Sequence, residues 1–212
     1  MTALMTPEEI AAHFTRADGQ YHFARWGRPL APVAFGIEEE TLPVLKGATE
    51  AVAKLAGHEV VETDPELGAN LMIFFFRDWQ ELPGVPNLDR LVPDLEPLVA
   101  RLTKADASQY RVFRFDEAGA IRACFIFIRM SGEMTEQPAE TLALGQAVQA
   151  ILLWSEEAFA SRSPLGRLED GQVILRPEIA GLIRAAYTPV LPAVAQDASH
   201  ALRLYARLTP PE

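Results

Sequence analysis

Hydrophobic and polar positions over the first half of this 212-residue chain follow two different spacings. Residues 38–57 open with three glutamates, carry leucine, valine and alanine at helical spacing and end at a glycine, which predicts an amphipathic helix. The unbroken apolar run 71–76 predicts a strand buried on both faces, and shorter strands are predicted at 32–35 and 58–62. Strands and helices therefore alternate, as they do in α/β proteins.

A β-hairpin and a long helix are predicted further along the chain. Charged and apolar side chains alternate over 110–115, turn-forming residues follow at 117–119, and 121–129 provides the return strand. The helix predicted at 139–159 is apolar on nearly every face of its central part, which is typical of a helix buried in the middle of a domain. We expect this helix to lie against the sheet.

The remaining segments complete the predicted fold. Helices are predicted at 6–16, 94–104, 176–187 and 192–208, and polar loops at 131–137 and 162–172. This order predicts an α/β (α+β) fold in which a twisted mixed β-sheet has a long central helix against it and helices toward the C-terminus. We expect residues 1–212 to form a single domain, with an N-terminal helical arm (1–18), a sheet-rich part (19–130) and a helical part (131–212).

Composition and charge narrow the possible partners. The formal net charge of −10 disfavours nucleic acid and anionic membrane surfaces, both of which are bound through clustered lysine and arginine. The N-terminus lacks the basic and apolar regions of a signal peptide, and the longest uncharged apolar run, 67–76, is too short to span a bilayer as a helix. A cytoplasmic location is therefore predicted. Cys124 is the one cysteine, so no disulfide can form within the chain, and its apolar neighbours predict a buried thiol.

The histidines do not form a metal motif. The chain has four, at His13, His22, His58 and His200, and no two are close in sequence. A hydrolytic zinc site usually needs three protein ligands and an open position. The sequence therefore predicts no metal, no cofactor and no catalytic residue, and each histidine is expected at the surface or at a cap.

Two glutamines interrupt the apolar central helix. Gln146 and Gln149 are three residues apart, so they lie on adjoining parts of one helix face. One interpretation is a polar pocket wall. The other is that both amides simply bond to neighbouring backbone or stay near solvent, because buried polar groups are normally satisfied.

A basic cluster precedes the first strand. His22, Arg25 and Arg28 flank Trp26 and could bind an anion or a carboxylate beside its flat ring. The favoured alternative is that they form ion pairs with the acids of the 64–66 segment.

Several short segments resemble a known family. They are 64–70 with the apolar strand after it, 109–111, 123–127, the helix around Gly145, and 185–191. Over 21–208 the chain resembles the proteobacterial domain of unknown function 2927 family, whose members are often described as lipoproteins and whose core is distantly similar to zincin metallopeptidases. The resemblance implies a zincin-like fold, and it implies that relatives are exported.

The same resemblance implies that the zincin metal motif is absent. In zincins the helix after the hairpin supplies His-Glu-x-x-His, and the resemblance puts Gly145, Gln146 and Gln149 at the two ligand positions and the base position between them. Glycine has no side chain, an amide cannot take up a proton at neutral pH, and glutamine is a weak ligand. Both metal assistance and base catalysis would be lost.

Three hypotheses about function follow. The first is a catalytically inactive zincin-like module that binds a peptide or protein segment at a sheet edge. Its expected binding residues are Gln146, Gln149, Arg114, Arg111, His22 and Arg25. The second is a metal-independent enzyme for a small anionic substrate, with a site made of His22, Arg25, Asp64, Glu66 and Arg111. The third is an architectural subunit that docks through the helix at 192–208. The sequence does not determine the oligomeric state.

Overall fold

A four-stranded sheet forms the centre of the computed structural model, which describes residues 5–208 apart from the side chain of Glu133. In spatial order its strands are β2 (Pro32–Phe35), β3 (Leu71–Phe76), β5 (Ile121–Arg129) and β4 (Gln109–Phe115). The first three run parallel, and β4 runs antiparallel to β5. The sheet is therefore twisted and mixed, as predicted, and the hairpin of β4 and β5 supplies its antiparallel edge.

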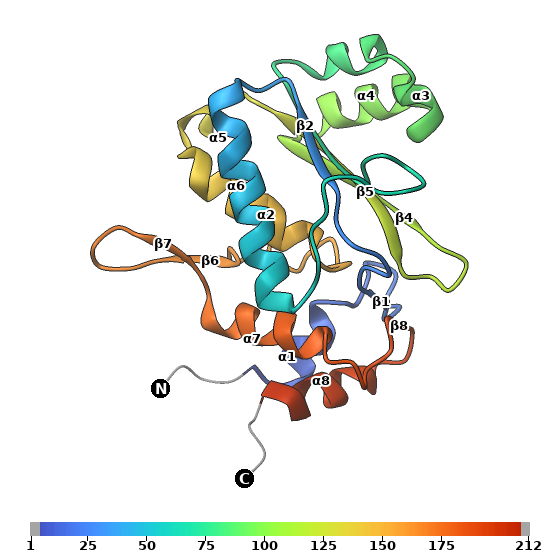
Figure 1. Cartoon of the computed structure of the whole chain (residues 1–212), viewed down its shortest axis with the longest axis vertical. Helices are drawn as coiled ribbons and strands as arrows, with labels where there is room; N and C mark the ends of the chain where they lie inside the picture. Colours follow the sequence, from blue (N-terminus) through green and yellow to red (C-terminus); the bar gives the residue numbers. More distant parts are fainter. Residues whose placement is uncertain (1–4, 209–212) are drawn as a thin grey trace.

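Helices cover both faces of this sheet (Figure 1). On one face, α2 (Leu42–Ala56) and α6 (Ala139–Ala150) share a hydrophobic cluster with Ile73 and Cys124. On the other face, η2 (Trp79–Gly84), α3 (Leu88–Leu91) and α4 (Leu95–Lys104) form a second cluster with Phe74 and Phe127. Neighbouring strand residues point to opposite faces, so the unbroken apolar run of β3 serves both clusters, as predicted.

Segments from the two halves of the chain meet at one end of the molecule, where the blue and red parts of Figure 1 lie together. Helix α1 (Pro7–Ala12) contacts α8 (His200–Leu208), and α7 (Pro177–Ala186) contacts α8 and α2. Strand β1 (Phe23–Ala24) pairs antiparallel with β8 (Val194–Ala195). The remaining elements are η1 (Glu39–Thr41), α5 (Glu133–Glu136), β6 (Leu165–Arg167) and β7 (Val173–Leu175).

The central helix ends earlier than predicted. The sequence predicted a helix over 139–159, whereas α6 stops at Ala150. Aromatic side chains bind the carbonyl groups at its end: Trp26 Nε1 donates to the Ala150 oxygen at 2.8 Å, and the Tyr187 hydroxyl donates to the Ile151 oxygen at 2.8 Å. The apolar pattern continues past this point, so only contacts with distant parts of the chain end the helix.

Other secondary-structure predictions also need correction. Residues 58–62 form an isolated bridge at Val60 and not a strand. The loops predicted at 131–137 and 162–172 contain α5 and β6 respectively, and β6 pairs with β7 as a short antiparallel hairpin. The helix predicted at 192–208 begins only at His200, after β8.

Local end signals were predicted more reliably. Thr6 and Glu9 form the reciprocal capping box expected at the start of α1, and Gly57 ends α2 in the left-handed conformation with φ of 66°. Within residues 5–208, no helix is both long enough and apolar enough to cross a bilayer. The prediction that the N-terminus is not a signal peptide concerns a segment that includes residues 1–4, which lie outside the described residues.

Candidate functional site

Arg111 links strand β4 to the central helix. Its Nη2 donates to Oε1 of Gln146 at 2.7 Å, and its Nη1 donates to Oε1 of Gln149 at 3.2 Å. Gln109, two residues earlier on β4, completes the cluster, because its Oε1 accepts from Gln146 Nε2 at 3.0 Å and from Arg111 Nη2 at 3.4 Å. The two helix glutamines therefore bond to side chains of the edge strand and not only to nearby backbone.

Arg111 is partly buried and lines the cleft beside β4. Its Nε atom is buried and has no hydrogen-bond partner among the described residues. Desolvation lowers the pKa of the Arg111 guanidinium, although arginine still keeps its proton in proteins. Its side-chain bonds go to neutral amide oxygens, and it makes no ion pair with a described carboxylate. The charge is thus held by dipoles alone.

A cleft of about 750 Å³ runs along β4 beside this cluster. Its lining includes residues 109–113 of β4, Arg16, and residues 153–156 and 159–164. A second hollow of about 470 Å³ adjoins it at the start of α6. Both are lined by Gln109, Gln149, Ser163 and Pro164. The volumes are those of ligand sites, and the glutamine cluster stands where the two hollows meet.

The outer edge of β4 pairs with no other strand in residues 5–208. The amide of Arg129 donates to the oxygen of Ser108. In the antiparallel pattern that this bond sets, the backbone groups of residues 110, 112 and 114 face β5, whereas those of 109, 111 and 113 face outward. The cleft is therefore bordered by a strand whose outward N–H and C=O groups have no strand partner, although the Phe113 oxygen accepts from Arg114 Nη1 at 3.3 Å.

Arg114 lies away from this cluster. It is three residues from Arg111 on the same strand, so the two side chains point to opposite faces of the sheet. Its Nη2 donates to the oxygen of Leu91 at the end of α3, at 2.7 Å. The structure therefore separates Arg114 from Gln146 and Gln149, beside which the binding hypothesis had put it.

His22 and Arg25 also lie outside the cluster. The Arg25 guanidinium is 5.3 Å from the centre of the Tyr187 ring, and the His22 ring stacks on Phe115 at 6.0 Å. Desolvation, followed by repulsion from Arg16, lowers the pKa of His22, so it is neutral at pH 7. Neither side chain has a described contact with Arg111, Asp64 or Glu66, although the second hypothesis needed these groups together.

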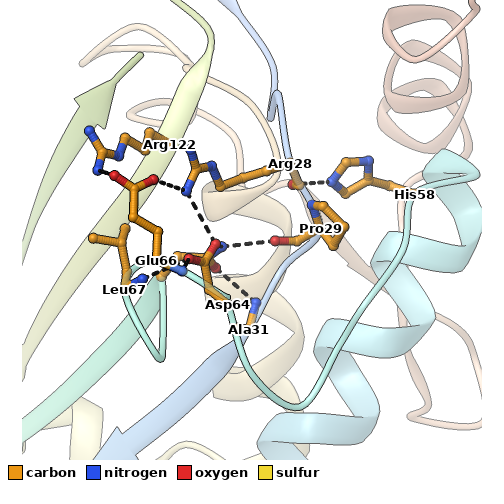
Figure 2. A network of polar contacts seen from close by, with 9 residues as sticks. Arg28, Pro29, Ala31, His58, Asp64, Glu66, Leu67 and Arg122 are labelled. Atoms are coloured by element: carbon orange, nitrogen blue, oxygen red, sulfur yellow. Dashed lines mark hydrogen bonds and ion pairs between the residues drawn. The ribbon is translucent and has the colours of Figure 1, made fainter.

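Arg28 pairs with the predicted acids (Figure 2). Its Nη1 lies 3.3 Å from Oδ2 of Asp64 and 3.0 Å from Oε2 of Glu66, and Arg122 also pairs with Glu66. Asn70 adds a bond from Nδ2 to Asp64 Oδ2 at 3.0 Å. The ion pairing preferred for the basic cluster is confirmed for Arg28, whereas it is wrong for His22 and Arg25, which contact Phe115 and Tyr187.

Asp64 has a structural role in this network. Its Oδ1 accepts from the amides of Glu66 and Leu67 at 2.9 and 2.8 Å, which closes the turn predicted there. Desolvation raises the pKa of Asp64, but these two amides, Asn70 and Arg28 outweigh it and the pKa is lowered overall. A carboxylate that is kept ionised in this way is poorly suited to accept and return protons at neutral pH.

Each of the other histidines has its own separate hydrogen-bond partner. His13 and His58 bond to the backbone oxygens of Glu9 and Arg28, at 2.7 and 2.9 Å. His200 was expected at the surface or at a cap, but it is buried, 3% exposed, and bonds to the hydroxyl of Tyr21 at 2.9 Å. In the part of the chain that the structure describes, no group of three or more His, Cys, Asp or Glu side chains could hold a metal ion.

Sequence reasoning missed two parts of the site. Gln109 is one strand repeat before Arg111, and this spacing alone would have put both side chains on one face. The segment 153–164 was expected to continue the long helix and then to form a loop, so its place in the cleft lining had no sequence signal. Comparison of the chain with models of known families, with curated proteins and with solved structures finds no match.

Proposed function

We propose that this protein is a catalytically inactive zincin-like module that binds an extended peptide or protein segment in the cleft beside β4. The observation that carries the proposal is the position of Arg111. Its guanidinium is bound by the amide oxygens of Gln146 and Gln149, at the floor of a cleft bordered by an unpaired strand edge.

The chemistry of this cluster supports binding over hydrolysis. The resemblance to the domain of unknown function 2927 family aligns Gly145, Gln146 and Gln149 with the zincin motif, and the two amide oxygens already accept N–H groups from a cation. A positive charge at this point repels a metal ion, and an amide cannot act as a general base. The cytoplasm is the proposed compartment, in keeping with the free, buried thiol of Cys124.

The geometry of β4 supports an extended ligand. A segment that adds to the edge would bond to the outward backbone groups of residues 109, 111 and 113. Its alternate side chains would then point toward the face that carries Arg111 and Gln109. The 750 Å³ cleft offers room for several such side chains.

Peptide selection followed by amide exchange tests this proposal. A pool of random octapeptides is passed over immobilised protein, and the enriched sequences are identified by mass spectrometry and synthesised. With a bound peptide, NMR-detected hydrogen exchange should slow at the amides of residues 109, 111 and 113. The amides of 110, 112 and 114 already bond to β5 and serve as the internal reference.

Two tryptophan variants make the test specific to the cleft. Ala160 lines the cleft and is exposed, so Ala160→Trp should fill it and weaken peptide binding at least about tenfold. Ala51 is exposed on α2 and does not line the cleft, so Ala51→Trp should leave binding unchanged. Equal enrichment on the wild-type and Ala160→Trp proteins, or a bound peptide that leaves the outward amides unprotected, would refute the proposal.

A further inference from the structure

The arginines that line the cleft differ in their partners. Arg16 pairs with Glu156 at 2.9 Å, and Arg162 pairs with Glu178 at 3.0 Å. Arg111 is the third arginine of the lining, and it pairs with no described carboxylate. It also bonds to Gln109 and Gln149, which line both hollows. The cleft therefore contains a cation whose countercharge is missing among the described residues.

Neutral acceptors compensate this charge only in part. The three hydrogen bonds use at most three of the five N–H groups of the guanidinium. Of the two that remain, the Nε–H is buried, so one N–H of Nη1 is left for another acceptor. The bonds to glutamine are already charge-assisted by the guanidinium, but a carboxylate would add the attraction of an opposite charge and can accept two parallel N–H groups. The bonds of Arg111 to Gln149 and Gln109 are long, at 3.2 and 3.4 Å, whereas the bond to Gln146 is 2.7 Å.

These lengths indicate which contacts a ligand would replace. Gln146 is 3% exposed and fixes the guanidinium from below, whereas Gln109 and Gln149 line both hollows. A carboxylate that enters from the cleft would take over the donors of the two long bonds. The released amides would then be free to bond to the backbone of the same ligand.

We propose that the ligand presents a carboxylate to Arg111, either from an aspartate or glutamate side chain or from a free C-terminus. This inference rests on the proposed peptide-binding function and names the chemical class that the site selects. The guanidinium provides the charge, Gln146 keeps it oriented, and the edge of β4 aligns the segment that carries the acid.

Three peptide pools test the charge and its source. All have a fixed central residue between random positions: a capped pool with central glutamate, a capped pool with central glutamine, and a glutamine pool with a free C-terminal carboxylate. Wild-type protein should enrich one of the two acidic pools at least about tenfold over the capped glutamine pool, because only a carboxylate brings the opposite charge to the guanidinium. The pool that is enriched identifies the source of the carboxylate.

Matched variants assign the preference to Arg111. Arg111→Met should remove it, whereas Arg114→Met, the same change on the opposite face of the same strand, should keep it. Arg111→Lys retains the charge and should keep part of the preference. If Arg111→Met and Arg114→Met both prefer the acidic pool as strongly as the wild type does, Arg111 does not bind the carboxylate.

A direct measurement covers the case in which Arg111→Met fails to fold. The buried Nε–H of Arg111 should give a resolved signal in ¹H–¹⁵N spectra, and acetate should shift it while equal chloride does not. Equal enrichment of all three pools, without an acetate shift, would overturn the carboxylate inference and leave peptide binding standing. Enrichment of no pool, with a saturable acetate shift, would instead overturn peptide binding and leave an anion site.

Discussion

Asn70 is the residue whose replacement should most clearly destabilise the loop that leads into β3. It is fully buried, and its amide makes three bonds: Oδ1 accepts from Ala31 N at 2.8 Å, and Nδ2 donates to the Pro29 oxygen at 2.8 Å and to Asp64 Oδ2 at 3.0 Å. Asn70→Leu keeps the size and removes every partner. Asp64 retains Arg28, so the main cost falls on the buried amide of Ala31 and the part-buried oxygen of Pro29.

The expected loss follows from those two groups. Each buried group without a partner costs about 1–3 kcal/mol, which gives about 2–6 kcal/mol in the free energy of unfolding. A domain is stable by only about 5–15 kcal/mol, so the effect is large. Glu66→Gln is the control, because Glu66 is exposed and its ion pairs should contribute less than about 1 kcal/mol.

Urea unfolding followed by circular dichroism measures both variants. With a slope of about 2–3 kcal/mol per molar urea, Asn70→Leu should lower the midpoint by about 0.7–3 M, and Glu66→Gln should shift it far less. The reasoning fails if the two variants have the same midpoint, because the buried amide would then contribute no more than a surface ion pair.

Two further predictions concern other buried groups. Desolvation and repulsion from Arg203 lower the pKa of His200 to about 4 in the folded protein. As the pH falls, the unfolded chain therefore takes up this proton before the folded protein does. The free energy of unfolding should decrease between about pH 6.5 and pH 4, by up to roughly 3 kcal/mol. His200→Gln should make this decline shallower in urea titrations at several pH values, and an unchanged decline would refute the assignment. Trp26→Phe leaves the Ala150 oxygen at the end of α6 without its donor and should cost about 1–3 kcal/mol. Thermal unfolding checks this, and an unchanged midpoint would mean that the cap is dispensable.

The sheet could be predicted because its signals are local. The apolar run of β3 and the alternation in β4 and β5 depend on neighbours along the chain, and each strand lies where it was expected to within a residue or two. The end of α6 could not be predicted, because it depends on Trp26 and Tyr187, which are over a hundred and over thirty residues away along the chain. The short strands β1 and β8 could not be predicted either. Each has two residues, which carry no periodic pattern, and each depends on pairing with the other end of the chain.

In the candidate site, too, local features could be predicted and contacts between distant residues could not. Gln146 and Gln149 were predictable as a pair because an apolar helix makes two amides stand out, and the spacing of three fixes their common face. Their bonds to Arg111 depend on how the hairpin packs on α6, which no spacing encodes. The position of Arg114 was predicted wrongly although the sequence held the signal. The alternation that predicted the strand also puts the side chains of Arg111 and Arg114 on opposite faces.

The N-terminal segment finds its partners late in the synthesis of the chain. Phe23 pairs with Ala195, and Trp26 bonds to the backbone of Ala150. At the usual speed of translation, roughly 10–30 s pass between the emergence of the first of these aromatic residues and the arrival of its strand partner. During that interval Phe23 lacks its strand partner, so incorrect pairing can start at this stretch.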